Sequence, residues 1–287
     1  MEIKKERIFK TAPLPFQGQK RRFASAFTIA MQQVKARKEV KIIVDLFGGS
    51  GLLSHTAKRI LPECKVIYND FDNYSQRLRN ISNTNRLLAD IRLLVGDWPK
   101  DEKINQEIKN EILKRIEYEE KNNCFVDYIT LSASLLFSAR YVLTYKELSK
   151  EYFYNVVKAT DYDFAANEYL EDLNIVRMDY KELYRKYKDI PGVLFIVDPP
   201  YLSTDTKTYQ SDKYWKLRDY LDVLNVLTGS NYVFFTSNKS SLIELCEWFD
   251  DNRNIGNPFK NSVLNIQNVT VNKTGKYTDM MLYKFVK

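Results

Sequence analysis

A run of five apolar residues, Val193 to Val197, is followed directly by Asp-Pro-Pro-Tyr at positions 198–201. The run predicts a buried strand, and the two prolines end it because proline fixes φ and has no N–H to donate. In an open α/β sheet, ligands bind at the carboxyl edge of the strands. The pattern therefore predicts that one carboxylate, Asp198, and one ring, Tyr201, lie at a ligand-binding edge.

This tetrapeptide suits a planar heterocycle that carries an exocyclic amino group. The amino group would donate hydrogen bonds to the Asp198 carboxylate and the Pro199 carbonyl, and the heterocycle would stack on Tyr201. A simple strand-ending turn uses the same residue types and is the alternative for these four residues taken alone.

A second apolar strand is predicted just before a glycine-rich turn. Residues 41–51 read Lys-Ile-Ile-Val-Asp-Leu-Phe-Gly-Gly-Ser-Gly, and a helix is expected from Leu52 to about Ile60. The turn matches neither the Gly-x-Gly-x-x-Gly dinucleotide fingerprint nor a phosphate-binding loop. A further strand, 66–70, ends in Asp70, and an acid about twenty residues after a glycine turn suits a ribose diol. Together these segments indicate a site for adenosine without phosphates.

Four segments resemble, in the same order, the adenine-N6 DNA methyltransferases of the Dam type, the D12 class. They are Phe16-Gln17-Gly18-Gln19-Lys20, Asp45 to Gly51, Asn69-Asp70, and Asp198 to Tyr201. The second and fourth segments are the specific ones, and weaker similarity extends over most of the chain. The resemblance implies an α/β fold: a doubly wound, Rossmann-like sheet that binds S-adenosylmethionine, with a mainly helical target-recognition subdomain inserted into it.

The resemblance also implies roles for individual residues. Catalysis would belong to Asp198, Pro199, Pro200 and Tyr201. Lys20 would meet the methionine carboxylate of the cofactor, and Asp179 the amino group of its adenine, although a helix N-cap explains Asp179 equally well. The full set of implied cofactor contacts is Phe16, Gly18, Lys20, Asp45, Phe47, Gly49, Gly51, Asp70, Asp179 and Asp198.

The middle of the chain has a different composition. Residues 101–121 carry an isoleucine at every fourth position among lysines and glutamates, which predicts an amphipathic helix with a solvated charged face. Residues 122–190 interleave tyrosines with basic residues, which is typical of a nucleic-acid groove, although tyrosines that pack a helical subdomain explain it as well. In the resemblance this stretch holds the target-recognition region, and the residues expected to contact DNA are Arg140, Lys146, Lys150 and Lys158.

The domain assignment follows from these segments. We expect 1–98 and 174–287 to form the cofactor-binding catalytic domain, and 99–173 to form the inserted, DNA-binding subdomain. Other patterns predict helices at 23–35, 181–187 and 216–227, strands ending near Asp179 and at 231–235, and a mobile loop over 202–214 that orders over substrate. Strands at 263–271 and 277–286 flank Asn272-Lys273-Thr274-Gly275, a hairpin signal, and predict an antiparallel pair that closes the sheet.

Composition agrees with this assignment. The net charge of +7 over 287 residues suits a polyanionic partner, although many proteins are mildly basic. The cysteines, Cys64, Cys124 and Cys246, form no Cys-x-x-Cys pair, and the single histidine, His55, is expected to be a surface or packing residue. Without a signal peptide or an apolar stretch of membrane length, we expect a cytoplasmic protein with no membrane partner and no metal.

These expectations combine into a site-specific DNA methyltransferase that flips an adenine out of the duplex. Hydrogen bonds to Asp198 and Pro199 would localise the lone pair of the amino nitrogen, which then attacks the methyl group of S-adenosylmethionine directly and in line. Three alternatives stay open: transfer to cytosine N4, transfer to adenine in RNA, and a catalytically silent DNA-binding module of the same fold. Double-stranded DNA is the expected partner, with a cognate restriction endonuclease as a second one if the chain is the modifying half of a restriction system.

Overall fold

The structure is a computed structural model that describes residues 9–123, 125–137, 140–200, 217–238, 242–251, 256–270 and 276–286. The chain divides into two compact units. Unit 1 consists of Met1–Thr11, Gln19–Asp72 and Leu170–Lys287, and unit 2 of Ala12–Gly18 and Asn73–Tyr169.

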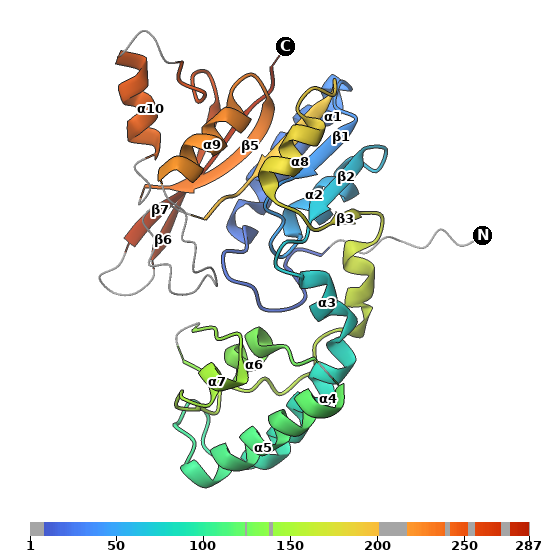
Figure 1. Cartoon of the computed structure of the whole chain (residues 1–287), viewed down its shortest axis with the longest axis vertical. Helices are drawn as coiled ribbons and strands as arrows, with labels where there is room; N and C mark the ends of the chain where they lie inside the picture. Colours follow the sequence, from blue (N-terminus) through green and yellow to red (C-terminus); the bar gives the residue numbers. More distant parts are fainter. Residues whose placement is uncertain are drawn as a thin grey trace, which may run out of the picture. The chain divides into compact units, whose positions relative to one another are not determined.

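Unit 1 is built on a sheet whose described strands follow the order β3-β2-β1-β4-β5-β7-β6 (Figure 1). The parallel strands are β1 (Ile42–Asp45), β2 (Lys65–Asn69), β3 (Asn174–Val176), β4 (Val193–Val197) and β5 (Asn231–Ser237). The order reverses between β1 and β4, and such a switch point is where open α/β sheets bind ligands. The doubly wound, Rossmann-like sheet predicted from the sequence is thereby confirmed.

The last two strands close the sheet in the predicted antiparallel manner. β6 (Val263–Thr270) pairs with β7 (Lys276–Lys284), and β7 pairs with β5. The residues between β6 and β7, predicted as a hairpin turn, lie outside the described part of the chain.

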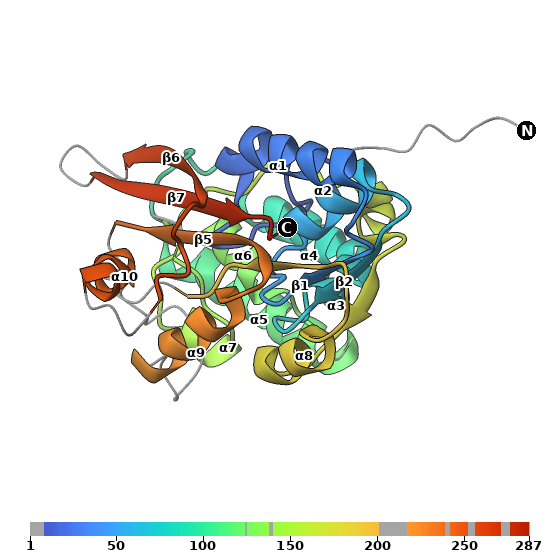
Figure 2. The same ribbon diagram turned by 90° about the horizontal axis from the view of Figure 1, so that it is seen from above.

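Helices cover both faces of the sheet. The 3-10 helix η1 (Arg21–Phe23), α1 (Ala24–Arg37) and α2 (Leu52–Ile60) lie on one face, and α8 (Tyr180–Tyr187) and α9 (Leu217–Leu227) on the other (Figure 2). Cys246 of α10 (Leu242–Asp251) is buried in the same core as α8 and α9.

Successive strand residues point to opposite faces, and this alternation produces two cores. Ile43, Leu194 and Val233 pack against α1 and α2. The residue after each of these, Val44, Phe195 and Phe234, packs on the α8 and α9 side. β4 is buried at all five positions, which explains why it reads as an unbroken apolar run.

One strand ends earlier than the sequence suggests. β3 stops at Val176, three residues before Asp179. Asp179 instead caps α8, because its side chain accepts the backbone N–H of Lys181 at 2.7 Å. The N-cap explanation is therefore the one that the structure shows for the local backbone.

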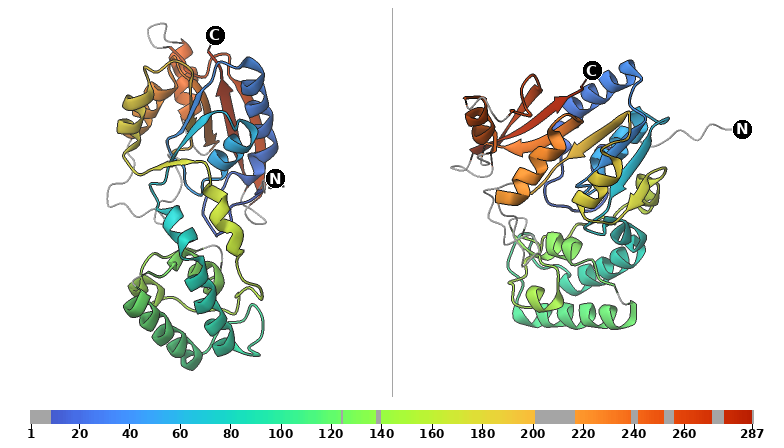
Figure 3. Two further views of the ribbon diagram at one scale, coloured as in Figure 1. Left: turned by 90° about the vertical axis from the view of Figure 1, so that its right-hand side faces the viewer. Right: turned by 45° about the horizontal axis from the view of Figure 1, so that its top comes forward.

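Unit 2 is mainly helical. Its helices are α3 (Tyr74–Arg79), α4 (Ile81–Val95), α5 (Gln106–Asn123), α6 (Tyr128–Leu135), α7 (Tyr145–Leu148) and most of η2 (Phe164–Leu170). α4 and α5 lie side by side (Figures 1 and 3). As the isoleucine spacing predicts, Ile112 and Ile116 of α5 are fully buried.

The charged face of α5 is only partly solvated, and here the expectation was too simple. Glu119 is buried, and it pairs with Arg86 of α4 and with Arg115 one turn earlier on α5. Lys109 is buried too, and its ammonium donates to the backbone carbonyls of Ser149 and Glu151. A buried charge needs such partners, and the sequence period does not reveal them.

The boundaries of unit 2 differ from the expected range 99–173. The unit begins at Asn73, ends at Tyr169 and also takes in Ala12–Gly18. α4 belongs to it because Asn85 exchanges two hydrogen bonds with the backbone of Tyr162, and Arg92 donates to the carbonyl of Ala159. Leu173 packs in the core of unit 1 instead.

Three further observations concern single residues and the helices. His55 is buried, and its Nε2 accepts the backbone N–H of Phe9 at 3.0 Å, so it is a packing residue, as expected. Cys64 and Cys246 are buried free thiols, while Cys124 lies outside the described residues. In the described part of the chain, no helix is both long and apolar enough to cross a bilayer.

Candidate active site

Two acids lie at the carboxyl edge of the sheet, where β1 and β4 run side by side. Asp45 is the last residue of β1 and lies opposite Ile196, and Asp198 follows the last residue of β4. Asp45 is 1% exposed, and the side chain of Asp198 is 17% exposed. The two strand ends thus bring together the acids of the two most specific sequence motifs.

Lys20 pairs with Asp198. Its Nζ lies 2.6 Å from Oδ2 of Asp198 and 5.8 Å from the centre of the Phe235 ring, and its side chain is only 10% exposed. Burial raises the pKa of the Asp198 carboxyl, and the neighbouring Lys20 ammonium opposes that rise. The resemblance assigns Lys20 to the methionine carboxylate of the cofactor and Asp198 to the amino group of the base. It does not predict that the two side chains pair with each other.

Asp45 is an acid with one unsatisfied oxygen. Its Oδ2 accepts a hydrogen bond from the Ser54 hydroxyl at 2.7 Å, whereas its Oδ1 is buried with no hydrogen-bond partner among the described residues. Burial raises the pKa of Asp45 to about 7; Ser54 opposes the rise, and the charge of Asp198 adds to it. A buried, half-satisfied carboxyl is a common feature of functional sites.

The turn after β1 has room only for glycine at two positions. A Cβ at position 48 would lie 2.3 Å from a ring carbon of Tyr68 and 2.7 Å from the carbonyl oxygen of Asn69. Gly51 has φ +73 and precedes α2 as its N-cap, and its N–H donates to the carbonyl of Gly48. The turn therefore has no side chain at positions 48 and 51, and its backbone there is open to close approach by a ligand.

Phe47 and Gly49 complete the expected cofactor turn. Phe47 is half-buried, with its ring 4.8 Å from that of Tyr180, and Gly49 has φ +49. The Tyr68 hydroxyl donates to the carbonyl of Gly49 at 2.7 Å.

Tyr68 and Asn69 hold this edge together, a role that the sequence did not reveal. The Tyr68 hydroxyl lies 3.1 Å from Oδ1 of Asp70, the acid expected to bind a ribose. The amide of Asn69 donates to the carbonyls of Leu46 and Met178, and its Oδ1 accepts the Met178 N–H. The one sequence signal that could have indicated this role is the polar pair Asn69-Asp70 at the carboxyl end of an apolar strand.

The remaining residues of the expected catalytic and cofactor sets lie as follows. Pro199 is buried and Pro200 half-buried directly after Asp198. Phe16 and Gly18 belong to unit 2, where the Phe16 ring meets Tyr74 edge to face and Gly18 has φ +80. Tyr201 and the predicted loop 202–214 lie outside the described residues.

The four basic residues expected to contact DNA are all exposed and all belong to unit 2. Arg140 forms an ion pair of 2.7 Å with Glu151, and the Lys158 ammonium lies 4.5 Å from the centre of the Tyr162 ring. Lys146 belongs to the short helix α7, and Lys150 follows it. Within the ranges that the structure describes, no group of His, Cys, Asp or Glu side chains is arranged to hold a metal ion.

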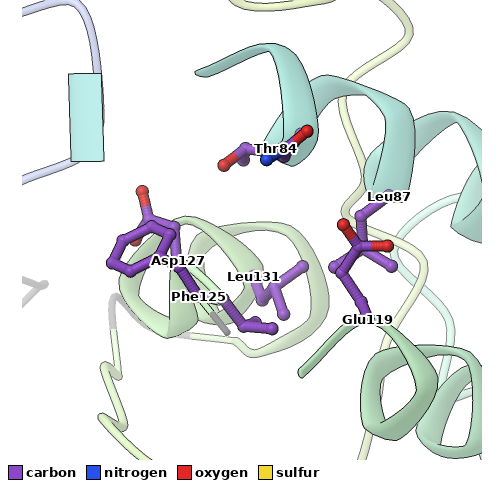
Figure 4. A pocket seen from close by; sticks show the side chains of 8 residues that line it. Thr84, Leu87, Glu119, Phe125, Asp127 and Leu131 are labelled. Carbon is purple, nitrogen blue, oxygen red and sulfur yellow. The ribbon is translucent and has the colours of Figure 1, made fainter. Parts of the chain in front are cut away.

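A small hollow within unit 2 is lined by none of these residues. It lies between α4, α5 and the start of α6 (Figure 4), and is lined by Asn83, Thr84, Leu87, Glu119, Phe125, Val126, Asp127 and Leu131. Its two acids already have partners, Glu119 in Arg86 and Asp127 in Arg77. We regard it as a packing feature of the unit.

The fold and the edge residues define a methyltransferase of the Rossmann-like class, and comparison with known proteins agrees. A protein of Haemophilus influenzae named "Putative methyltransferase" is 38% identical over 283 residues, which cover 98% of this chain and 94% of that protein. The family described as D12 class N6 adenine-specific DNA methyltransferase matches residues 16–241. The chain belongs to this family, and the resemblance read from the four motifs is confirmed.

Proposed function

We propose that the protein transfers the methyl group of S-adenosylmethionine to N6 of an adenine in double-stranded DNA. The observation that carries the proposal is the position of Asp198, a nearly buried acid at the carboxyl end of β4, beside the strand that leads into the glycine turn. Family membership supports adenine and DNA as the substrate class.

The residues at the sheet edge fit the cofactor. Its methionine end carries one ammonium and one carboxylate, for which Asp45 Oδ1 offers a buried acceptor in need of a partner and Lys20 a cation. Asp70 suits the ribose diol. An Asp179 carboxylate has acceptor sites beyond the one that caps α8, and they remain for the adenine amino group. With Phe16, Gly18, Phe47, Gly49, Gly51 and Asp198, these residues form the proposed cofactor set.

S-adenosylmethionine, when bound, supplies an electrophilic methyl group on a sulfonium. The protein's own contribution is to orient the amino nitrogen of the flipped adenine and to localise its lone pair. The Asp198 carboxylate and the Pro199 carbonyl would accept its two hydrogens, Pro200 would fix the backbone that holds them, and Tyr201 would stack on the ring. The negative charge of Asp198 also stabilises the positive charge that develops on the nitrogen.

The Lys20–Asp198 pair gives these steps an order. When Lys20 turns to the methionine carboxylate, the Asp198 oxygens lose their cation and become available to the amino group. Both side chains are largely buried, and charges attract each other more strongly away from water. The attraction of Lys20 for either carboxylate is therefore stronger than it would be at an exposed site. We therefore expect cofactor binding to prepare Asp198 for the base.

DNA would be held by the exposed cations of unit 2, Arg140, Lys146, Lys150 and Lys158. Surface cations that neutralise phosphates release counterions, and this makes the affinity for DNA depend on the salt concentration. A cognate restriction endonuclease would be a second partner if the chain is the modifying half of a restriction system.

The direct test is methyl transfer by the purified protein from S-adenosylmethionine labelled in its methyl group, with duplex DNA and RNA as competing substrates. After digestion to nucleosides, label in N6-methyl-deoxyadenosine is expected. Label in N4-methylcytosine or in RNA would replace the proposed substrate with one of the two alternative ones. Unlabelled nucleic acid, from protein that still binds the cofactor, would indicate a silent DNA-binding module.

A further inference from the structure

The segment Ala12–Gly18 is fixed within unit 2 by a tyrosine of α3. The Tyr74 hydroxyl accepts the backbone N–H of Leu14 at 2.9 Å and lies 3.2 Å from the Leu14 carbonyl oxygen, to which it donates. Both residues are buried, and the Phe16 ring meets the Tyr74 ring edge to face at 5.8 Å. One side chain therefore satisfies both backbone groups of Leu14 and packs on the residue that follows Pro15.

An arginine one turn further along α3 holds the next peptide. Nη2 of Arg77 donates to the carbonyl of Pro15 at 2.8 Å, and its guanidinium lies 5.2 Å from the centre of the Tyr74 ring. Its Nε donates to Oδ1 of Asp127 at 2.9 Å. Arg77 and Asp127 are both almost fully buried, so each depends on the other as a charge partner.

Asp127 links this contact to a second helix. It is the N-cap of α6, where it accepts the N–H of Thr130 at 3.1 Å and the Thr130 hydroxyl at 2.6 Å. Arg77 also donates to that hydroxyl at 3.2 Å. Its planar guanidinium is well suited to holding several acceptors in a fixed arrangement.

We propose that Tyr74 and Arg77 are positioning residues for the cofactor, because they fix the conformation of the segment that carries Phe16 and Gly18, and that Arg77 ties this segment to α6 through Asp127. The inference rests on the proposed function, which assigns Phe16 and Gly18 to the cofactor. Neither Tyr74 nor Arg77 needs to touch the cofactor. A segment that is ordered in advance loses less conformational freedom when a ligand binds, and this raises affinity.

The decisive variant is Tyr74→Phe, which keeps the ring and its contacts with Phe16 and Arg77 but removes both hydrogen bonds to Leu14. We expect the Kd and KM for S-adenosylmethionine to rise roughly tenfold, as the loss of two backbone hydrogen bonds implies, with kcat almost unchanged. Amide hydrogen exchange over residues 12–18 should accelerate in the same variant. Arg77→Lys, which keeps the charge but not the fork, should raise KM in the same direction.

Tyr232→Phe is the matched control. Tyr232 is fully buried in β5, and its hydroxyl donates to the carbonyl of Pro258 at 2.9 Å, so the substitution removes a comparable bond in unit 1. We expect it to lower Tm without changing KM. Equal cofactor affinity in the wild type and Tyr74→Phe, or an equal rise of KM in both variants, would overturn the inference.

The same titration separates this inference from the proposed function. A wild-type protein that binds no S-adenosylmethionine would overturn the proposed function and the inference together. A wild type that binds it and transfers methyl groups, beside a Tyr74→Phe variant with unchanged KM and unchanged exchange over residues 12–18, would overturn the inference alone.

Discussion

At the scale of single residues, the site depends on acids in places that water barely reaches. Asp45 loses hydration when the chain folds, and the Ser54 hydroxyl, a backbone hydrogen bond from Phe47 and the charge of Lys20 offset only part of that loss. Asp198 is compensated better, by a lysine ammonium in contact with its carboxylate. Because the Asp45 carboxylate is less well compensated than that of Asp198, we expect Asp45 to destabilise the fold at neutral pH. The Asp198 carboxylate is expected to be available for chemistry.

The first prediction concerns Asp45→Asn. Folding raises the pKa of Asp45 from 3.8 to about 7, so the folded protein keeps a proton that the unfolded chain has lost. The free energy of unfolding should therefore fall as pH rises between these values, by up to about 4 kcal/mol from this group. Asn cannot titrate, so the variant should lack this part of the fall. Urea unfolding across this pH range checks it, and parallel curves for wild type and variant would contradict it.

The second prediction concerns Asp198→Ala. The variant should lose methyl transfer, because Asp198 is the carboxylate proposed to hold the amino nitrogen. It should largely keep cofactor binding, because Asp198 no longer competes with the methionine carboxylate for Lys20. Single-turnover transfer and equilibrium binding of S-adenosylmethionine measure the two effects separately. Asp189→Ala, at an acid whose side chain is 85% exposed, is the control and should change neither. Transfer by Asp198→Ala would remove Asp198 from the mechanism.

At the scale of elements, the turn after β1 is held in contact with the end of β2. Tyr68 touches the turn with its ring and its hydroxyl, and Asn69 bridges Leu46 and Met178. The glycines are therefore needed for space as much as for backbone freedom. The ligand would meet a surface whose shape is set by two strands together.

The third prediction follows for Gly48→Ala. The added methyl group would overlap the Tyr68 ring and the Asn69 carbonyl, and the backbone atom cannot move aside easily. We expect a loss of about 1–3 kcal/mol in the free energy of unfolding, together with weaker cofactor binding. Gly256→Ala is the control, since no atom of the described residues lies within 4 Å of the added carbon. Similar denaturation midpoints for the two variants would show that the turn can relax.

Elements with a local signal were predictable from the sequence. The apolar runs that became β1, β4 and β5 end in glycine, proline or polar residues, and the isoleucine spacing of α5 matches its buried stripe. Asp179 was ambiguous because an N-cap and a ligand contact use the same residue type. The early end of β3 had no local signal, since Val176-Arg177-Met178 would also suit a strand.

At the scale of the whole molecule, the unpredicted features are contacts between segments far apart in the chain. Lys20 meets Asp198, and Arg77 joins Pro15 to Asp127. The sequence shows that Lys20, Asp198, Arg77 and Asp127 carry charged side chains, but it does not show which residues they contact. For the same reason, α3 and α4 were assigned to the catalytic domain, although their packing places them in unit 2.

The central claim is that this D12-family chain methylates adenine N6 in DNA. The most direct test is to express it in a host free of DNA methylation and to sequence the genomic DNA with direct detection of modified bases. We predict N6-methyladenine at one short recurring motif, absent when Asp198→Ala is expressed instead. Unmodified DNA from cells that contain protein able to bind S-adenosylmethionine would contradict the claim.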